Sequence, residues 1–115
     1  PGLPSHPQHD LFRRLSHPEF GFGGIFVIDA GTEERANTLM EHLQLQSGFG
    51  YIAVSLGYFE TLMSCSGSST SSELTEQEKK ESGITPGLVR FSIGLTGSLE
   101  QRMQQMEQAL DATGL

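Results

Sequence analysis

One short segment, residues 87–94, most restricts how this chain can fold, because an arginine interrupts its apolar residues. Arg90 lies between Val89 and Phe91, and the β-branched and aromatic residues around it predict a strand that is at least half buried. A guanidinium is costly to bury unless a carboxylate or a phosphate meets its planar fork. No acidic residue lies within seven positions of Arg90 on either side. Its partner is therefore either an acid that is distant in the sequence or a ligand.

Composition limits the size and the class of the protein. A chain of 115 residues has room for one domain with one modest core. The net charge of −7 argues against nucleic acid as a partner, because no basic stripe is present to displace counterions. There is no signal peptide and no apolar run near the roughly 18 residues of a membrane span, so we expect no membrane association. The single Cys65 excludes an internal disulfide and favours a reducing, cytoplasmic setting.

Turn, capping and periodicity signals predict four helices and four strands. The helices are expected from Ser5 or His6 to about Leu15, from Thr32 through Leu43, from Thr75 to Gly83, and from Ser98 through Leu110. The strands are expected at 24–29, 52–55, about 61–65, and around Arg90. The second and third strands lie too close together for a crossover helix, so we expect a hairpin or near-hairpin. The predicted fold is α+β, a mostly antiparallel four-stranded sheet with helices packed on one face.

Two of the predicted helices carry an apolar stripe at the i, i+3, i+4, i+7 spacing or close to it. The stripes are Ala36, Leu39, Met40 and Leu43 in the second helix, and Leu99, Met103, Met106 and Leu110 in the last. We interpret the four methionines as residues that fill the core rather than as a metal site or a peptide groove.

Several candidate sites are weaker than Arg90. His6, His9 and Asp10 share a helical face that could hold a metal, but no further ligand is indicated, so capping and solvation are favoured. Cys65 has no basic or histidine neighbour, which favours a buried, inert thiol over a nucleophile. The glycines of residues 21–24 lack the following helix that a phosphate-binding loop needs.

The segment Ser64–Ser72 has six serines among nine positions, a composition typical of a flexible linker. It connects the strand after Ser55 to the helix before Arg90, so both of its ends are tied near those residues. Serine hydroxyls can order a turn by bonding backbone groups. We therefore expect this loop to be structured where the rest of a longer protein is present and mobile where it is absent, and to be a place for specificity contacts.

Three ordered motifs resemble the pyridoxal-phosphate (PLP)-dependent Cys/Met metabolism enzymes, which include cystathionine γ-synthase, cystathionine γ-lyase and methionine γ-lyase. They are PGLPSHPQHD at residues 1–10, IAVSLGYFETL at 52–62 and GITPGLVRFSIGL at 83–95. The family writes them roughly as YPGLxSHPxHxL, SLGxxESL and GIxxxLIRLSVGLE. The resemblance implies the C-terminal domain of a fold-type I PLP enzyme. Residues 1–16 would be an interdomain junction and helix, and residues 17–115 the substrate-binding domain.

The resemblance also implies roles for three residues. Arg90 matches the family's arginine that binds the α-carboxylate of the amino-acid substrate, a bidentate contact that orients the substrate. Ser55 matches the serine that lines the same carboxylate site. Val54 precedes it at a position that helps to set specificity, and its apolar side chain is similar to methionine γ-lyase rather than to the glutamate of animal cystathionine γ-lyases. The implied reaction is γ-elimination or γ-replacement on methionine, cystathionine or O-acylhomoserine.

The cofactor implied by the resemblance is PLP, held by a large domain that this sequence does not contain. Lys79 and Lys80 match no Schiff-base motif, so the chain by itself is expected to be inactive, and no catalytic residue or metal is assigned to it. The resemblance implies that the whole enzyme is a cytoplasmic homotetramer. It would be a lyase or transferase that acts in transsulfuration or methionine metabolism. An alternative is a stand-alone, non-catalytic binding module. This sequence departs from the family pattern at two places. Residues 64–71 stand where the family has its HPAxMTH segment, and Thr96 stands where the family has the final glutamate of SVGLE.

Overall fold

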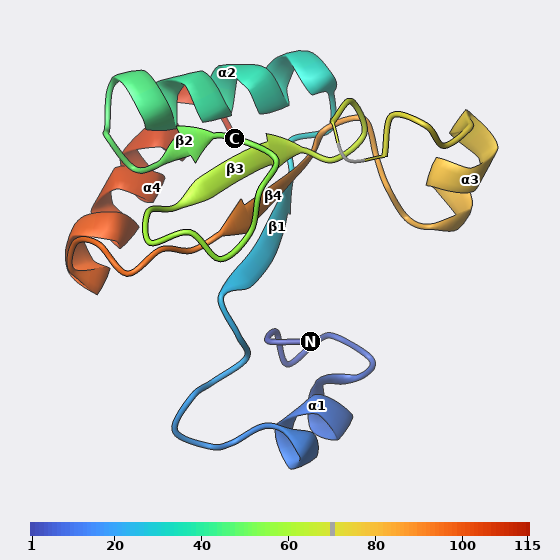
Figure 1. Cartoon of the computed structure of the whole chain (residues 1–115), viewed down its shortest axis with the longest axis vertical. Coiled ribbons are helices and arrows are strands. Elements are labelled where there is room, and N and C mark those ends of the chain that lie inside the picture. The colour runs from blue at the N-terminus through green and yellow to red at the C-terminus, as the bar shows by residue number, and fades with distance from the viewer. Residues whose placement is uncertain (70) are drawn as a thin grey trace.

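The computed structural model describes residues 1–69 and 71–115. The described chain forms four helices and four strands (Figure 1). They are α1 (His9–Leu15), β1 (Ile25–Asp29), α2 (Glu33–Leu45), β2 (Tyr51–Ile52), β3 (Leu62–Cys65), α3 (Glu76–Glu81), β4 (Leu88–Ser92) and α4 (Leu99–Thr113). None of these helices is long and apolar enough to cross a membrane.

The strands form one sheet in the order β1-β4-β3-β2. Strand β4 pairs antiparallel with both β1 and β3, which confirms the predicted α+β fold with its mostly antiparallel sheet. The predicted hairpin is wrong, because β2 and β3 pair in parallel. A parallel pair requires the chain to return from the end of β2 to the start of β3. Because only two residues of β2 pair with β3, this distance is short, and residues 53–61 span it without a helix.

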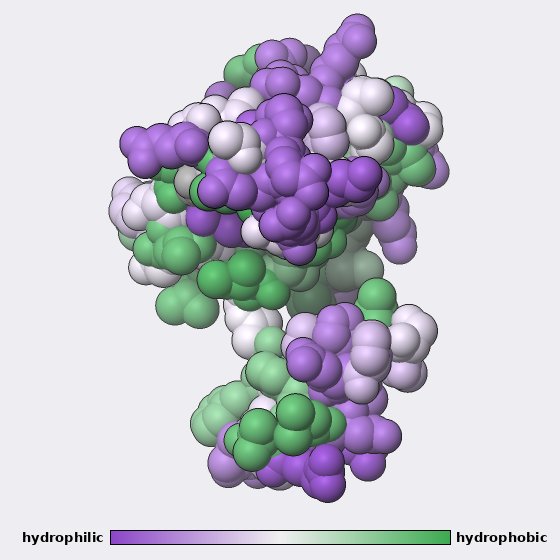
Figure 2. Space-filling view, turned by 90° about the vertical axis from the view of Figure 1, so that its right-hand side faces the viewer, coloured by the Kyte–Doolittle hydropathy of each residue, from purple (hydrophilic) through white to green (hydrophobic). Residues whose placement is uncertain are grey.

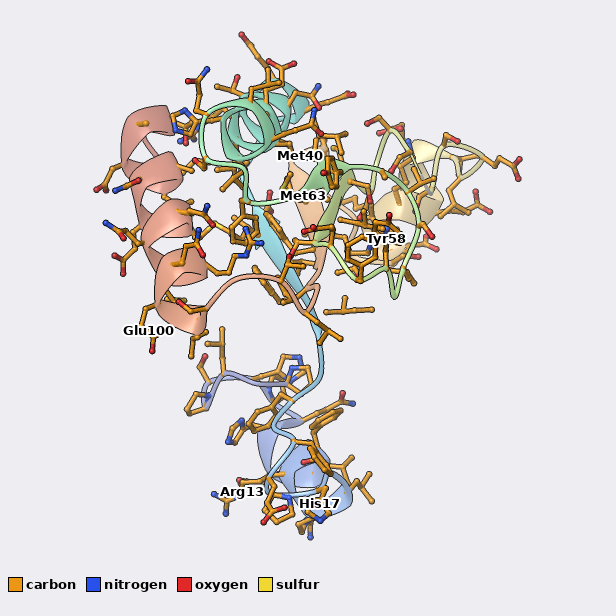
Figure 3. All side chains as sticks on the ribbon, turned by 60° about the vertical axis from the view of Figure 1, so that its left-hand side comes forward. Arg13, His17, Met40, Tyr58, Met63 and Glu100 are labelled. Carbon is orange, nitrogen blue, oxygen red and sulfur yellow. The ribbon has the colours of Figure 1, made fainter. Side chains whose placement is uncertain are left out.

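Helices α2 and α4 cover one face of the sheet, as predicted (Figure 1). All four residues of the α2 stripe are buried, and Figure 3 shows Met40 of α2 beside Met63 of β3. Phe91 of β4 stacks on Phe26 and meets Phe49 edge-on, with ring centroids 4.8 and 6.2 Å apart. Burial of these apolar side chains is the main favourable contribution to folding.

The apolar stripe predicted for α4 is only half right. Met106 is buried and Leu110 packs against the core, whereas Leu99 and Met103 are 73% and 53% exposed. The interpretation of all four methionines as core residues is therefore wrong for Met103. The first turns of α4 instead direct Arg102 and Gln105 at the turn before β2, where they donate to the carbonyl oxygens of residues 47–49. Backbone carbonyls in that turn need donors, so polar side chains take the inward positions at this end of the helix.

Side-chain caps begin the three later helices where the sequence predicted them. The Thr32 and Ser98 hydroxyls accept backbone N–H groups of the first turns of α2 and α4. Thr75 and Glu78 form the predicted capping box at α3. The Thr75 hydroxyl and amide donate to the Glu78 carboxylate, and these bonds hold the pKa of Glu78 below its ordinary value.

The first helix begins later than predicted and lies apart from the sheet (Figure 1). A turn closed by the bond from His6 N–H to the Leu3 carbonyl precedes it, so α1 starts at His9. The rings of His9 and Phe12 both stack on Phe22, which fixes α1 to the segment that leads into β1. Helix α1 and the segment around Phe22 therefore pack together apart from the sheet.

The serine-rich segment is folded into turns over most of its length, although Thr70 lies outside the described residues. Ser64 and Cys65 belong to β3 and are buried, and the Cys65 thiol donates to the Pro86 carbonyl. The Ser69 amide and hydroxyl both donate to the Cys65 carbonyl, as expected for serines that order a turn. The expectation of a buried thiol at Cys65 is confirmed.

Gly94 allows the chain after β4 to pass close to the segment before β3. A Cβ atom at this position would collide with the backbone of Phe59 and Glu60. The contact is reinforced by bonds from Gly94 N–H to the Thr61 hydroxyl and from Leu95 N–H to the Phe59 carbonyl. Because Gly94 has no side chain, the backbone of residues 59–61 can lie against it. This contact positions the C-terminal end of the loop between β2 and β3.

We predict that Gly94→Ala destabilises the fold by more than about 2 kcal/mol, because backbone rather than a flexible side chain has to move. Gly24→Ala is the matched control, since a Cβ there meets only the Ile93 carbonyl at 3.8 Å. The control should change the free energy of unfolding by no more than about 0.5 kcal/mol. Urea denaturation followed by circular dichroism measures both, and equal effects would contradict the prediction.

Candidate functional site

The site is built on the face of the sheet opposite to α2 and α4. Side chains of a strand alternate between faces, and Val89 and Phe91 of β4 are fully buried in the helix-covered core. Arg90 therefore points to the other face, where its neighbours in register are Val27 on β1 and Ser64 on β3. The strand pattern thus places the arginine away from the apolar core.

The loop of residues 53–60 crosses this second face and contacts Arg90. The Nη2 group of Arg90 donates to the carbonyl oxygens of Val54 and Ser55, at 3.0 and 3.1 Å. Farther along the loop, the Gly57 amide donates to the hydroxyl of Ser92, two residues after Arg90. Leu62 and Ser64 of β3, on the same face, are buried, while Val27 on the other side of Arg90 is exposed. Arg90 lies at the border between the covered and the open part of this face.

Arg90 has no acidic partner among the described residues. The acid nearest in register on this face is Asp29, and its Oδ1 accepts the Gly31 amide at 2.9 Å instead. The Nε atom of Arg90 is buried without a hydrogen-bond partner in the described chain, as is the hydroxyl of Ser64 across from it. A guanidinium with unused donors at the edge of an apolar face is suited to a carboxylate ligand.

The three residues predicted for the site come together in space. Ser55 and Arg90 are 35 positions apart, yet the Ser55 carbonyl accepts from Arg90 at 3.1 Å. It is the backbone of Ser55, not its hydroxyl, that makes this contact. The Val54 side chain is 61% exposed beside the same guanidinium and is free to contact a ligand. The roles assigned to these residues remain predictions.

Exposed apolar side chains surround the site. Figure 2 shows hydrophobic residues gathered between the polar α3 end of the molecule and the α1 arm. On this face of β1 and in the loop the exposed apolar side chains are Ile25, Val27, Val54, Leu56, Tyr58 and Phe59. Figure 3 shows Tyr58 on the loop that follows β2. A contiguous apolar surface of this kind is typical of a face that packs against more protein.

The histidines near the N-terminus make local contacts instead of a cluster. His6 Nδ1 accepts the Gln8 amide, and His9 Nδ1 lies 2.8 Å from the Pro1 carbonyl oxygen. Within the described residues, no three His, Cys, Asp or Glu side chains are arranged to hold a metal ion.

Comparison with known proteins decides the family. Residues 1–111 match the sequence profile described as "Cys/Met metabolism PLP-dependent enzyme". The chain belongs to this family. It is 58% identical to a methionine gamma-lyase from Arabidopsis thaliana and 35% identical to a cystathionine gamma-lyase from Bacillus subtilis, over 95% and 96% of its length. These alignments cover 25% and 27% of the two relatives, so the chain spans about a quarter of their length.

A solved structure agrees with this family. The crystal structure of cystathionine gamma synthase from Xanthomonas oryzae pv. oryzae in complex with cystathionine superposes with a TM-score of 0.82 at 29% identity. The match covers 98% of this chain and 27% of that one. The resemblance seen in the three sequence motifs is thereby confirmed at the level of family and fold.

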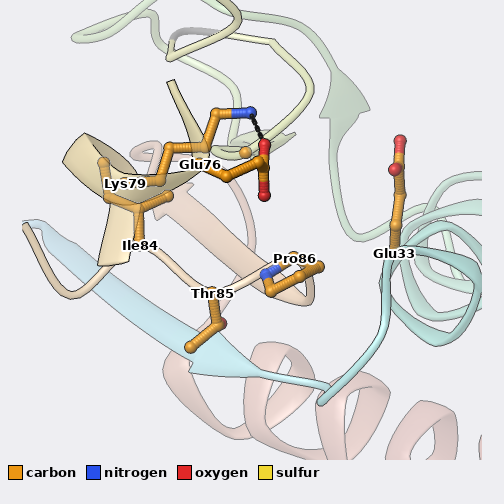
Figure 4. A pocket seen from close by; sticks show the side chains of 7 residues that line it. Glu33, Glu76, Lys79, Ile84, Thr85 and Pro86 are labelled. Carbon is orange, nitrogen blue, oxygen red and sulfur yellow. Dashed lines mark hydrogen bonds and ion pairs between the residues drawn. The ribbon is translucent and has the colours of Figure 1, made fainter. Parts of the chain in front are cut away.

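The residues described here do not by themselves fit the family cofactor. Lys79 and Lys80 both lie on α3, and Lys79 Nζ is 3.0 Å from Glu76 Oε1. A cavity of about 370 Å³ lies beside Lys79, Lys80 and Glu76. A smaller one of about 120 Å³ beside Lys79 is lined by both Glu33 and Glu76 (Figure 4). Two carboxylates in so small a space would repel a phosphate group. No step through PLP is therefore assigned to this chain alone.

We predict that this chain, incubated with PLP and reduced with borohydride, gains no stoichiometric adduct on Lys79 or Lys80. The reason is the acidic surroundings of Lys79, together with the surface position of α3. Intact-mass analysis measures the extent of labelling, and peptide mapping identifies the labelled residues. Stoichiometric labelling of either lysine would contradict the prediction, whereas sparse labelling spread over both lysines and the N-terminal amine is what ordinary surface amines give.

Proposed function

We propose that this chain is the C-terminal substrate-binding part of a PLP-dependent enzyme that acts on sulfur amino acids or activated homoserine. Arg90 binds the α-carboxylate of the substrate, and Ser55 lines the same site. The observation that carries the proposal is the half-buried Arg90, which has two carbonyl partners and no carboxylate among the described residues. Holding the carboxylate at one point of a rigid sheet fixes the orientation of the rest of the amino acid.

The domain organisation follows from the same proposal. Residues 1–16 form the junction to the large domain, and residues 17–115 form the substrate-binding domain. The separate α1 arm supports this division (Figure 1). The exposed apolar side chains beside Arg90 support burial against the rest of a longer enzyme, and they weigh against the alternative of a stand-alone binding module.

The large domain of the whole enzyme would hold PLP and supply the Schiff-base lysine, which leaves this chain inactive when isolated. The substrate is methionine, cystathionine or an O-acylhomoserine, and the reaction is an elimination or a replacement at its γ-carbon. From the family resemblance we further propose a homotetramer, and a cytoplasmic setting with which the buried, unpaired Cys65 is consistent.

We predict that Arg90→Lys in the full-length protein raises KM for amino-acid substrates by about tenfold or more. Lysine keeps the positive charge but loses the planar fork that meets a carboxylate. Steady-state kinetics measures the effect. Arg13→Lys is the matched control, because Arg13 lies exposed on α1, away from the sheet (Figure 3). An unchanged KM in Arg90→Lys would refute the proposed carboxylate site.

We predict that Val54→Glu shifts the preference of the full-length protein from methionine toward cystathionine, with the ratio of their kcat/KM values changing by about tenfold. A carboxylate at this exposed position attracts the distal ammonium group of cystathionine and disfavours the apolar S-methyl group of methionine. Val54→Gln controls for size and polarity without the charge. The prediction fails if the glutamine and glutamate variants show the same preference.

A further inference from the structure

Arg102, in the first turns of α4, is a second arginine whose donors are all directed at the chain itself. Its Nε–H donates to the Thr96 carbonyl at 2.9 Å. Its Nη1 donates to the carbonyl oxygens of Gly48 and Phe49, both at 3.0 Å. The side chain is 17% exposed, and its guanidinium carbon lies 5.7 Å from the centre of the Phe49 ring. These contacts hold the turn at which the chain leaves α2 for β2.

The same guanidinium also reaches the far end of the site loop. Its Nη2 donates to the Thr96 hydroxyl at 2.9 Å, and that hydroxyl donates to Glu60 Oε2 at 2.5 Å. Glu60 Oε2 lies 3.9 Å from Nη2, so the two charges are paired through Thr96 and partly withdrawn from water. Partly buried charges are screened less by salt than exposed ones.

Arg102 therefore binds both ends of the segment 48–60. Between these ends lie Val54 and Ser55, whose carbonyl oxygens receive the Nη2 group of Arg90. Arg102 adds to the bonds from Gly57 N–H to the Ser92 hydroxyl and from Leu95 N–H to the Phe59 carbonyl, so its loss should let the Val54 and Ser55 carbonyls shift. The sequence around Arg102 carries no signal of this role, because backbone carbonyls accept three of its hydrogen bonds and leave no pattern in the sequence.

We propose that Arg102 is a positioning residue for the carboxylate site, acting with Thr96 and Glu60. It holds the loop so that the Val54 and Ser55 carbonyls fix the orientation of the Arg90 guanidinium. The inference rests on the proposed function, in which Arg90 binds the substrate carboxylate. Arg102 itself does not contact the substrate.

The kinetic test uses Arg102→Gln in the full-length protein. We expect KM for the amino-acid substrate to rise about five- to tenfold and kcat to change less than about twofold, since only the fit of the carboxylate is loosened. Thr96→Val, which removes the bridging hydroxyl and keeps the volume, should raise KM in the same direction by a smaller factor. It also keeps the test decisive if Arg102→Gln does not fold.

Arg35→Gln is the matched control. Arg35 on α2 donates to the Gly114 carbonyl at 2.7 Å, so it too is an arginine that ties α4 to another element. It does not contact the 48–60 segment, and its substitution should leave KM unchanged. A rise in KM in Arg35→Gln equal to that in Arg102→Gln would show general loosening of the fold and overturn the proposal.

Hydrogen exchange supplies a readout that is independent of activity. Amides of residues 53–60 should exchange faster in Arg102→Gln than in the unsubstituted protein, and at the same rate in Arg35→Gln. Unchanged exchange in Arg102→Gln overturns the proposal. Arg90→Lys measured in parallel separates the two claims. If KM rises in Arg90→Lys but not in Arg102→Gln, the positioning role alone is overturned. If KM is unchanged in Arg90→Lys, the proposed function is overturned and the positioning role with it.

Discussion

Strand β4 is the element on which the rest of the molecule depends, because it pairs with β1 along one edge and with β3 along the other. Its alternate side chains serve two purposes. Val89 and Phe91 are fully buried against the helices and contribute the favourable burial that holds the layers together. Arg90 lies between them and is turned to the opposite face. The same strand therefore contributes to the stability of the fold and positions Arg90 in the candidate site.

The second face of the sheet is divided by the loop between β2 and β3. Over β3 and β4 the loop supplies backbone carbonyls to Arg90, and over β1 the face is open and apolar. Carbonyl partners hold a guanidinium without neutralising its charge, so Arg90 keeps its attraction for an anion. A carboxylate partner from the same domain would have cancelled that attraction. This arrangement is what makes the site suited to a substrate with a carboxylate.

Arg102 and Arg90 differ in how fully their hydrogen-bond donors are satisfied within the chain. Arg102 places its donors on carbonyl groups and on Thr96, and it pairs with Glu60 across 3.9 Å, so it is satisfied within the chain. Arg90 keeps a buried Nε without a partner among the described residues. Buried polar groups are normally hydrogen-bonded, and those that are not often mark a functional position. The contrast separates an arginine whose donors are satisfied within the chain from one that keeps an unused donor among the described residues.

The sequence by itself determined the helix caps, the buried stripe of α2, the strand around Arg90 and the lack of a local acid beside it. All of these depend on residues close together in the chain. Only the tertiary structure decided that β2 and β3 run in parallel, that Arg102 rather than Leu99 or Met103 faces inward on α4, and that Ser55 meets Arg90 through its carbonyl. These features depend on backbone groups brought together from distant positions, and every residue carries the same carbonyl.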